Sequence, residues 1–177
     1  MNSSEQYGKS NNSQRGFTLI EVMVAMLIVS VGILGVAGIQ LVSLQQNQSA
    51  MLNSEALMVG NTILDRIRAN AQSDYGGVDY TDVPTAAARN CITSSCSPAE
   101  MAVYDIAQWK CSINSTLEPV ANTSHPVCLS LATEGKLPDG NGRIVKATDS
   151  YTVTIEWRDD RAGARREISL RTQIRGT

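Results

Sequence analysis

Residues that could carry out chemistry are sparse in this sequence of 177 residues. It contains a single histidine, His125, which argues against a histidine-based metal site and against a Ser/His/Asp triad. Asp74, Asp79 and Asp82 supply oxygen ligands in one loop, but their spacing matches no Ca²⁺-binding loop, so we expect a solvated loop. The sequence therefore predicts a protein that is not an enzyme and that holds no cofactor or metal.

The charge balance bears on the class of partner. The chain has 15 Lys and Arg residues against 17 Asp and Glu residues, which gives a net charge of −2. A protein that binds nucleic acid by neutralising phosphates is broadly basic. We therefore expect no nucleic acid partner.

Glu21 places a carboxylate in an apolar stretch, where an ionised side chain is energetically unfavourable. Glu21 is the single formal charge in the apolar run of residues 17–44. An ionised side chain inside a bilayer costs about 2.5–3.5 kcal/mol on insertion scales unless a partner compensates it. A simple membrane anchor has no use for such a residue, so Glu21 is a candidate functional residue.

The apolar run is long enough to cross a membrane. As a helix that rises about 1.5 Å per residue, residues 17–44 extend roughly 42 Å, which exceeds a bilayer core of about 30 Å. Lys9 and Arg15 precede the run, and the next cation is Arg66. By the positive-inside rule the N-terminus stays in the cytoplasm and the rest of the chain lies outside. Residues 1–16 are polar and are expected to be disordered.

The residues around Glu21 carry a resemblance to a known family. The hexapeptide GFTLIE at residues 16–21, between a polar leader and the apolar run, resembles the class III signal of type IV prepilins. The resemblance implies that a prepilin peptidase/N-methyltransferase removes residues 1–16 as a leader, cutting between Gly16 and Phe17, and methylates Phe17. It also implies assembly with other minor and major pilins, in which Glu21 pairs with the Phe17 amine of a neighbouring subunit. The chain would then reside in the inner membrane with a periplasmic head before it enters a pilus on the cell surface.

Helical patterning continues beyond the apolar run, over residues 45–72. Apolar side chains recur there every three or four positions, which is the spacing of an amphipathic helix; they are Leu52, Ala56, Val59, Ile63 and Ile67. The transmembrane and amphipathic parts are therefore predicted to form one long helix. Residues 73–177 are predicted to form a globular head.

Two kinds of element are predicted in the head. Ser97, Pro98 and Glu100 have the order of a helix cap, a first-turn proline and a capping-box glutamate, and the helix is predicted to run to about Ser112. Residues 151–157 and 168–174 alternate between apolar and polar side chains, as half-buried strands do, and 143–147 is a predicted third strand. We therefore expect an α+β fold in which an antiparallel sheet packs on the long helix, with one further capped helix.

Arginines gather in the predicted connection between the last two strands. They are Arg158, Arg161, Arg165 and Arg166. We interpret them as a solvated sheet edge that discourages strand pairing. The alternative is docking on an acidic neighbour, or weak contact with DNA.

The head also resembles that of the PilV-type minor pilins. The similarity lies in residues 96–110, in a Leu-Pro-x-Gly turn at 137–140 and in a Tyr-x-Val-x-x-x-Trp strand at 151–157. It implies a pilin-like architecture. Major pilins usually carry a proline where this chain has Gly38, a departure that suits a minor subunit.

The four cysteines, Cys91, Cys96, Cys111 and Cys128, lie on the oxidising side of the membrane in this topology, where disulfides are favoured. Cys91 and Cys96 are close enough to pair across a loop, which leaves Cys111 to pair with Cys128. Three connectivities are open to four cysteines. The C-x₂-C spacing of a zinc site is absent.

These observations lead to one main hypothesis and two alternatives. The main hypothesis is a minor type IV pilin, a structural subunit that supports pilus assembly, a tip complex, and pilus-dependent motility or attachment. A minor pseudopilin of a type II secretion system would share the signal and the helix. A membrane-anchored periplasmic binding protein or adhesin would use the head to recognise a ligand.

Overall fold

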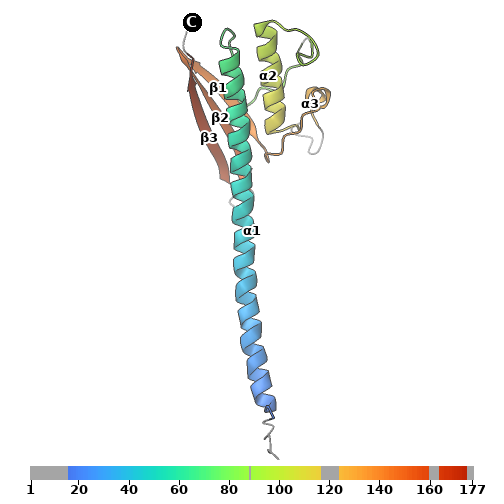
Figure 1. Ribbon diagram of the computed structural model, residues 1–177, viewed down its shortest axis with the longest axis vertical. Coiled ribbons are helices and arrows are strands. Elements are labelled where there is room, and N and C mark those ends of the chain that lie inside the picture. Colours follow the sequence, from blue (N-terminus) through green and yellow to red (C-terminus); the bar gives the residue numbers. More distant parts are fainter. Residues whose placement is uncertain (1–15, 88, 117–123, 160–163, 175–177) are drawn as a thin grey trace, which may run out of the picture. The chain divides into compact units, whose positions relative to one another are not determined.

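The computed structural model describes residues 16–87, 89–116, 124–159 and 164–174. The prediction that the leader is disordered concerns residues 1–15, which lie outside these ranges, and so does Arg161. The chain divides into two units, residues 1–46 and residues 47–177. The first helix, α1 (Leu19–Ala69), contributes to both units (Figure 1).

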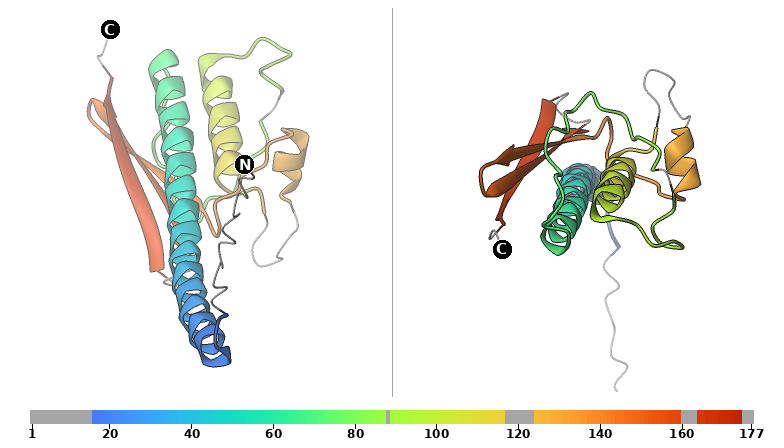
Figure 2. Two further views of the ribbon diagram at one scale, coloured as in Figure 1. Left: turned by 60° about the horizontal axis from the view of Figure 1, so that its bottom comes forward. Right: turned by 90° about the horizontal axis from the view of Figure 1, so that it is seen from above.

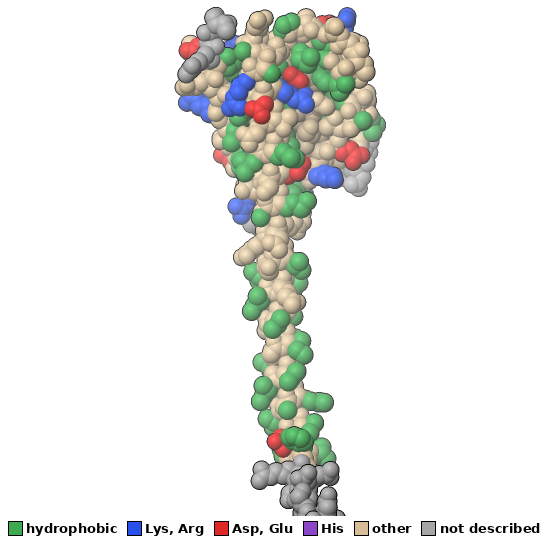
Figure 3. All heavy atoms as spheres, viewed as in Figure 1, with side chains coloured by type: hydrophobic (Ala, Val, Ile, Leu, Met, Phe, Trp, Pro, Cys, Tyr) green, Lys and Arg blue, Asp and Glu red, His purple; other side chains and the backbone are tan. Residues whose placement is uncertain are grey.

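The part of α1 in the first unit is an apolar helix whose side chains are all exposed within the described part of the chain. Its start is marked by Thr18, whose carbonyl oxygen accepts a hydrogen bond from the Glu21 N–H at 3.1 Å, while its hydroxyl lies 3.4 Å from the same nitrogen. Hydrophobic side chains are exposed all along this part, with one acidic group near its start (Figure 3). Among the described residues, α1 is the one helix whose length and composition suffice to cross a membrane.

In the second unit, the remaining part of α1 buries an apolar face against the sheet. Ala56, Val59, Ile63 and Ile67 are all buried, as their helical spacing predicts. Gly60 lies on the same face, and a Cβ atom at this position would lie 2.6 Å from Leu170 Cδ1. A glycine here therefore lets the helix approach the sheet closely.

The second helix, α2 (Pro98–Ile113), begins with the predicted capping box. The Ser97 hydroxyl accepts from the Glu100 N–H at 3.3 Å, and the Glu100 carboxylate accepts from the Ser97 N–H at 2.8 Å. Trp109 and Ile113 are buried on its inner face. The prediction of a capped helix is confirmed, and it ends one residue beyond the expected position.

A short third helix, α3 (Pro126–Ser130), was not predicted. Its N-cap is His125, whose Nδ1 accepts a hydrogen bond from the Val127 N–H at 3.2 Å. The side chain caps a helix and is half-buried, because Pro126 starts a helical turn that the sequence around it does not announce.

The described strands form one antiparallel sheet in the order β1 (Asn141–Ala147), β2 (Ser150–Asp159) and β3 (Ala164–Gln173). In the central strand the side chains that face the helices are buried; they are Tyr151, Val153, Ile155 and Trp157. Seen from above, α1 lies against the sheet and α2 lies beside α1 (Figure 2). The predicted α+β, pilin-like arrangement is confirmed.

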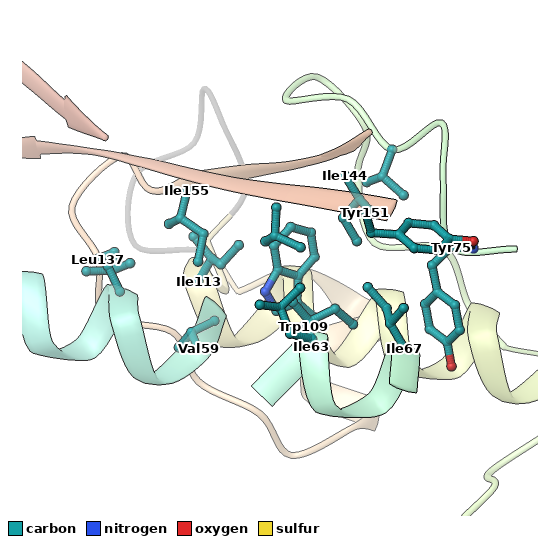
Figure 4. Packing of buried hydrophobic residues seen from close by; sticks show 14 of the residues in the cluster. Val59, Ile63, Ile67, Tyr75, Trp109, Ile113, Leu137, Ile144, Tyr151 and Ile155 are labelled. Carbon is teal, nitrogen blue, oxygen red and sulfur yellow. Dashed lines mark hydrogen bonds between the residues drawn. The ribbon is translucent and has the colours of Figure 1, made fainter. Parts of the chain in front are cut away.

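One hydrophobic core joins these elements (Figure 4). It contains Ile63 from α1, Trp109 from α2, Ile155 from β2, and also Tyr75 and Leu137 from connecting segments. Packing is tight where α2 meets β1, because a Cβ atom on Gly142 would lie 2.5 Å from the Trp109 ring.

Candidate functional site

The N-terminal end of the first unit presents the residues that the signal motif singles out. Phe17 is 81% exposed and precedes the helix, and the position of a Cβ atom on Gly16 has no neighbouring atom within 4 Å. The peptide bond between Gly16 and Phe17 is therefore accessible to another protein. Its accessibility is a requirement for proteolysis, which needs an extended segment that a protease can enclose.

Glu21 lies on an otherwise apolar side of α1. Ala25, Val29 and Ile33 follow at four-residue intervals and line the same face. Among the described residues, no cation and no hydrogen-bond donor contacts the Glu21 carboxylate. Ser30, the one polar side chain between Val22 and Ile39, is satisfied within the helix, because its hydroxyl donates to the Leu27 carbonyl at 2.8 Å. Glu21 is thus a carboxylate in need of a partner from outside the described chain.

In the head, a buried carboxylate connects three elements. Asp105 of α2 accepts hydrogen bonds from Arg66 Nη1 at 2.8 Å and from the Tyr75 hydroxyl at 2.7 Å. Asn70 donates to the same hydroxyl at 3.0 Å and to the Pro98 carbonyl at 2.8 Å. Burial raises the pKa of the Tyr75 phenol. This network fastens the end of α1 to both the loop that follows it and the start of α2.

The acidic loop, which contains Asp74, Asp79 and Asp82, is stabilised by contacts with other residues of the chain. Asp74 accepts from the Gly76 N–H at 2.9 Å and from the Tyr151 hydroxyl at 3.1 Å, and it pairs with Lys146 at 3.3 Å. The hydrogen bond from Gly76 lowers the pKa of Asp74, and Lys146 and Tyr151 add to the effect while burial opposes it. Within the described ranges no three metal-ligating side chains come together. The geometry favours a structural loop.

Lys110 of α2 is a buried cation that the sequence does not reveal. Its Nζ donates to the Asp79 carbonyl at 2.6 Å and to Asn141 Oδ1 at 3.1 Å. Burial lowers the pKa of Lys110 to about 8, against the opposing influence of the charges on Asp82 and Asp79. The ammonium thereby fixes both the acidic loop and the turn before β1.

Carboxylates accompany the arginines near the hairpin between β2 and β3. Arg158 pairs with Asp139 at 2.9 Å, and Arg166 pairs with Asp159 at 3.0 Å. Arg165 contacts Glu156. These contacts reduce the local positive charge, so they favour a solvated edge over a patch that attracts DNA.

The four cysteines form two disulfide bonds in the head. Cys91 is bonded to Cys96 ahead of α2, with Cα atoms 5.5 Å apart. Cys111 is bonded to Cys128, which ties the end of α2 to α3, with Cα atoms 5.3 Å apart. The second bond lies in the interior, because both of its cysteines are buried.

We expect peptide mapping without reduction to find no free thiol and to recover these two links. Replacing Cys111 and Cys128 together by alanine should lower the free energy of unfolding of the head by about 2–4 kcal/mol, because the unfolded chain regains the freedom that the crosslink removes. A Cys91–Cys111 link in the peptide map would contradict this connectivity.

Several residues important for the head carried no usable sequence signal. Asp105 and Lys110 lie within the predicted capped helix, and no local pattern marks either of them, or Tyr75, as buried. Their partners lie about 30 residues away along the chain. A polar residue on the flank of an apolar helical face is usually exposed. The pattern alone therefore predicts that Asp105 and Lys110 are exposed, whereas both are buried.

Two family models match the chain. The prokaryotic N-terminal methylation motif covers residues 11–37, and the family described as type IV pilin Tt1218 covers residues 38–107. No curated protein and no solved structure matches the chain significantly.

The first match contains Gly16, Phe17 and Glu21, and the second begins within α1 and ends in α2. The methylation motif implies processing by a prepilin peptidase and assembly with other pilins, and together with the apolar helix it fits an anchor in the inner membrane and a place in a pilus. Type IV pilins are structural proteins. These two matches and the α+β arrangement agree with one another: the chain is a type IV pilin-like protein.

Proposed function

We propose that this protein is a minor type IV pilin that supports pilus assembly and acts near the tip of the fibre. The observation that carries the assembly role is the Glu21 carboxylate. It lies on an apolar helical face, four residues after an accessible Gly16–Phe17 bond, and it has no partner among the described residues. The minor role rests on the similarity of the head to PilV-type minor pilins and on Gly38.

In this proposal, processing creates the partner that Glu21 lacks. Cleavage between Gly16 and Phe17 leaves an α-amine on Phe17, and methylation lets that amine keep its positive charge. In a staggered helical array, the amine of one subunit lies beside the Glu21 carboxylate of another. Pairing of two charges in a medium of low dielectric is strongly favoured over leaving either charge alone, provided that the geometry is good. The head is periplasmic until the subunit enters the pilus.

Processing is tested by the mass of the mature chain. In a strain with an active prepilin peptidase, the protein from the membrane fraction should begin at Phe17 and carry one added methyl group. Gly16→Ala should be cut more readily than Gly16→Leu, because a cleavage site that accepts glycine has little room for a side chain. An intact Met1 N-terminus in that strain would refute the processing step.

Deletion of the gene separates the proposed function from its two alternatives. Loss of surface pili and of twitching motility, with secretion unaffected, is the expected outcome. Failure of type II secretion with normal pili would indicate a pseudopilin. Normal pili with lost attachment would indicate a membrane-anchored binding protein or adhesin.

A further inference from the structure

The head contains a polar cavity that pilus assembly does not explain. It has a volume of about 500 Å³ and lies between the loop around Tyr80 and Asp82, the end of α2, and the turn before β1. Its volume falls within the range of roughly 300–1,000 Å³ that is usual for small-molecule sites. The cavity belongs wholly to the second unit and is remote in sequence from Gly16, Phe17 and Glu21.

Two asparagines on its wall are fixed in orientation and have unused donors. Asn141 Oδ1 accepts from Lys110 Nζ at 3.1 Å and from the Gly142 N–H at 2.9 Å. Asn114 Oδ1 accepts from the Thr116 N–H at 3.0 Å and from the Thr116 hydroxyl at 2.7 Å. In each amide the oxygen is engaged twice, which orients the amide plane. Neither Nδ2 group has an acceptor among the described residues, and neither is a buried atom without a partner, so both nitrogens reach solvent.

Other groups on the wall extend this pattern. Because His125 Nδ1 accepts from the Val127 N–H, the proton of the neutral ring lies on Nε2, which becomes a further donor. Asp82 accepts from the Asp79 N–H with Oδ2 and keeps Oδ1 as an acceptor. Tyr80 adds an aromatic ring. The wall therefore offers several donors, an acceptor and an apolar surface around one space.

The charges on the wall are largely compensated. Asp139 pairs with Arg158, and Arg165 contacts Glu156. Lys110 and Asp82 carry opposite charges and attract each other. A wall with little net charge has no strong preference for an anion or a cation, and it suits a neutral ligand rich in hydroxyl groups, each of which both donates and accepts hydrogen bonds.

From these contacts we propose that the cavity binds a neutral saccharide of one to three sugar units. The Nδ2 groups of Asn114 and Asn141 donate to its hydroxyl oxygens, and Asp82 accepts from a hydroxyl. The ring of Tyr80 packs against the apolar face of a sugar ring. This activity is independent of whether the subunit is minor or major, and it would give a pilus that carries the protein a means of recognising glycans.

The test is retention of the full-length chain on immobilised neutral mono-, di- and trisaccharides. The protein is kept in a phosphocholine detergent, because maltoside detergents carry sugar headgroups that would compete. Arrays of carboxylate-bearing glycans and duplex DNA are included for comparison. We expect retention on at least one neutral saccharide and weaker retention on both anionic probes.

Two isosteric variants test the proposed contacts. Asn114→Asp and Asn141→Asp keep an oxygen that can accept from Thr116, Gly142 and Lys110, but each replaces a donor by an acceptor. Each should weaken binding about tenfold, as expected for the loss of one well-placed hydrogen bond in a polar site. Melting temperatures should change little. Asn61→Asp, the same change on an exposed position of α1, is the control and should bind as the unmodified chain does.

Three results would overturn the proposal. The first is no retention on any neutral saccharide of the panel. The second is equal binding by Asn114→Asp, Asn141→Asp and the unmodified chain. The third is a loss of binding by Asn61→Asp as large as that of the cavity variants, which would show that added negative charge alone is responsible.

Discussion

Replacing Glu21 by valine should leave the chain in the membrane and remove it from pili. The change takes a costly charge out of the apolar run, so insertion should be maintained or improved. Cleavage at Gly16 lies upstream and should largely survive. Incorporation should fail, because the Phe17 amine of a neighbouring subunit loses its carboxylate partner. An unmatched charge of a buried pair costs about 3–5 kcal/mol, which corresponds to a loss in association of roughly a hundredfold or more.

The measurement compares the amount of the variant in sheared pili with the amount in the membrane fraction. Ser30→Ala is the matched control, because Ser30 is a polar side chain in the same apolar stretch of α1 and its hydroxyl already bonds to Leu27 within the helix. Removing that hydroxyl takes no partner away from another subunit, so Ser30→Ala should enter pili normally. Glu21→Val at the unmodified level in sheared pili would refute the pairing between subunits.

Replacing Asp105 by alanine should destabilise the head more than the removal of an exposed ion pair would. The change leaves Arg66 without its carboxylate and the buried Tyr75 hydroxyl without its acceptor. The Asp105 side chain is 8% exposed and that of Arg66 is 30% exposed, so solvent recovers part of the loss on the arginine side. We expect the free energy of unfolding to fall by about 3 kcal/mol.

Urea unfolding of the full chain in detergent, followed by tryptophan fluorescence, measures this difference. Trp109 and Trp157 are both buried in the head, so the signal reports on the head alone. Asp65→Ala is the control, because Asp65 pairs with Arg68 at 2.6 Å where both side chains are more than half exposed. That variant should lie within about 1 kcal/mol of the unmodified chain. Equal losses for the two variants would show that the buried network contributes nothing beyond a surface pair.

Much of the architecture could be predicted from local patterns. The apolar run and the three-to-four-residue spacing that follows it predicted α1, and Ser97, Pro98 and Glu100 predicted the start of α2. Alternation of apolar and polar side chains predicted β2 and β3, and residues 143–147 were predicted as a third strand. These signals are reliable because each depends on residues that are neighbours on one face of a single element.

The signal motif at residues 16–21 can also be recognised from the sequence alone. Its recognition needs only a short accessible segment ahead of a helix, and Gly16 and Phe17 precede α1 outside regular secondary structure. Tertiary contacts therefore add little to the recognition of the processing site. For Glu21 the structure adds one fact, which is that no described residue is a partner for its carboxylate.

The interior of the head was decided by tertiary structure. Gly135 illustrates this: a Cβ atom there would lie 2.4 Å from the backbone of Ile113, so the chain can cross the end of α2 only at a residue without a side chain. Tyr75, Asp105 and Lys110 are buried because partners from distant segments satisfy their polar groups. Asn141 of the cavity likewise depends on Lys110, which lies 31 residues away, whereas Asn114 is held by the nearby Thr116. A local pattern records which face of an element is apolar, whereas burial of a polar group becomes favourable only once folding has brought its partner within hydrogen-bonding distance.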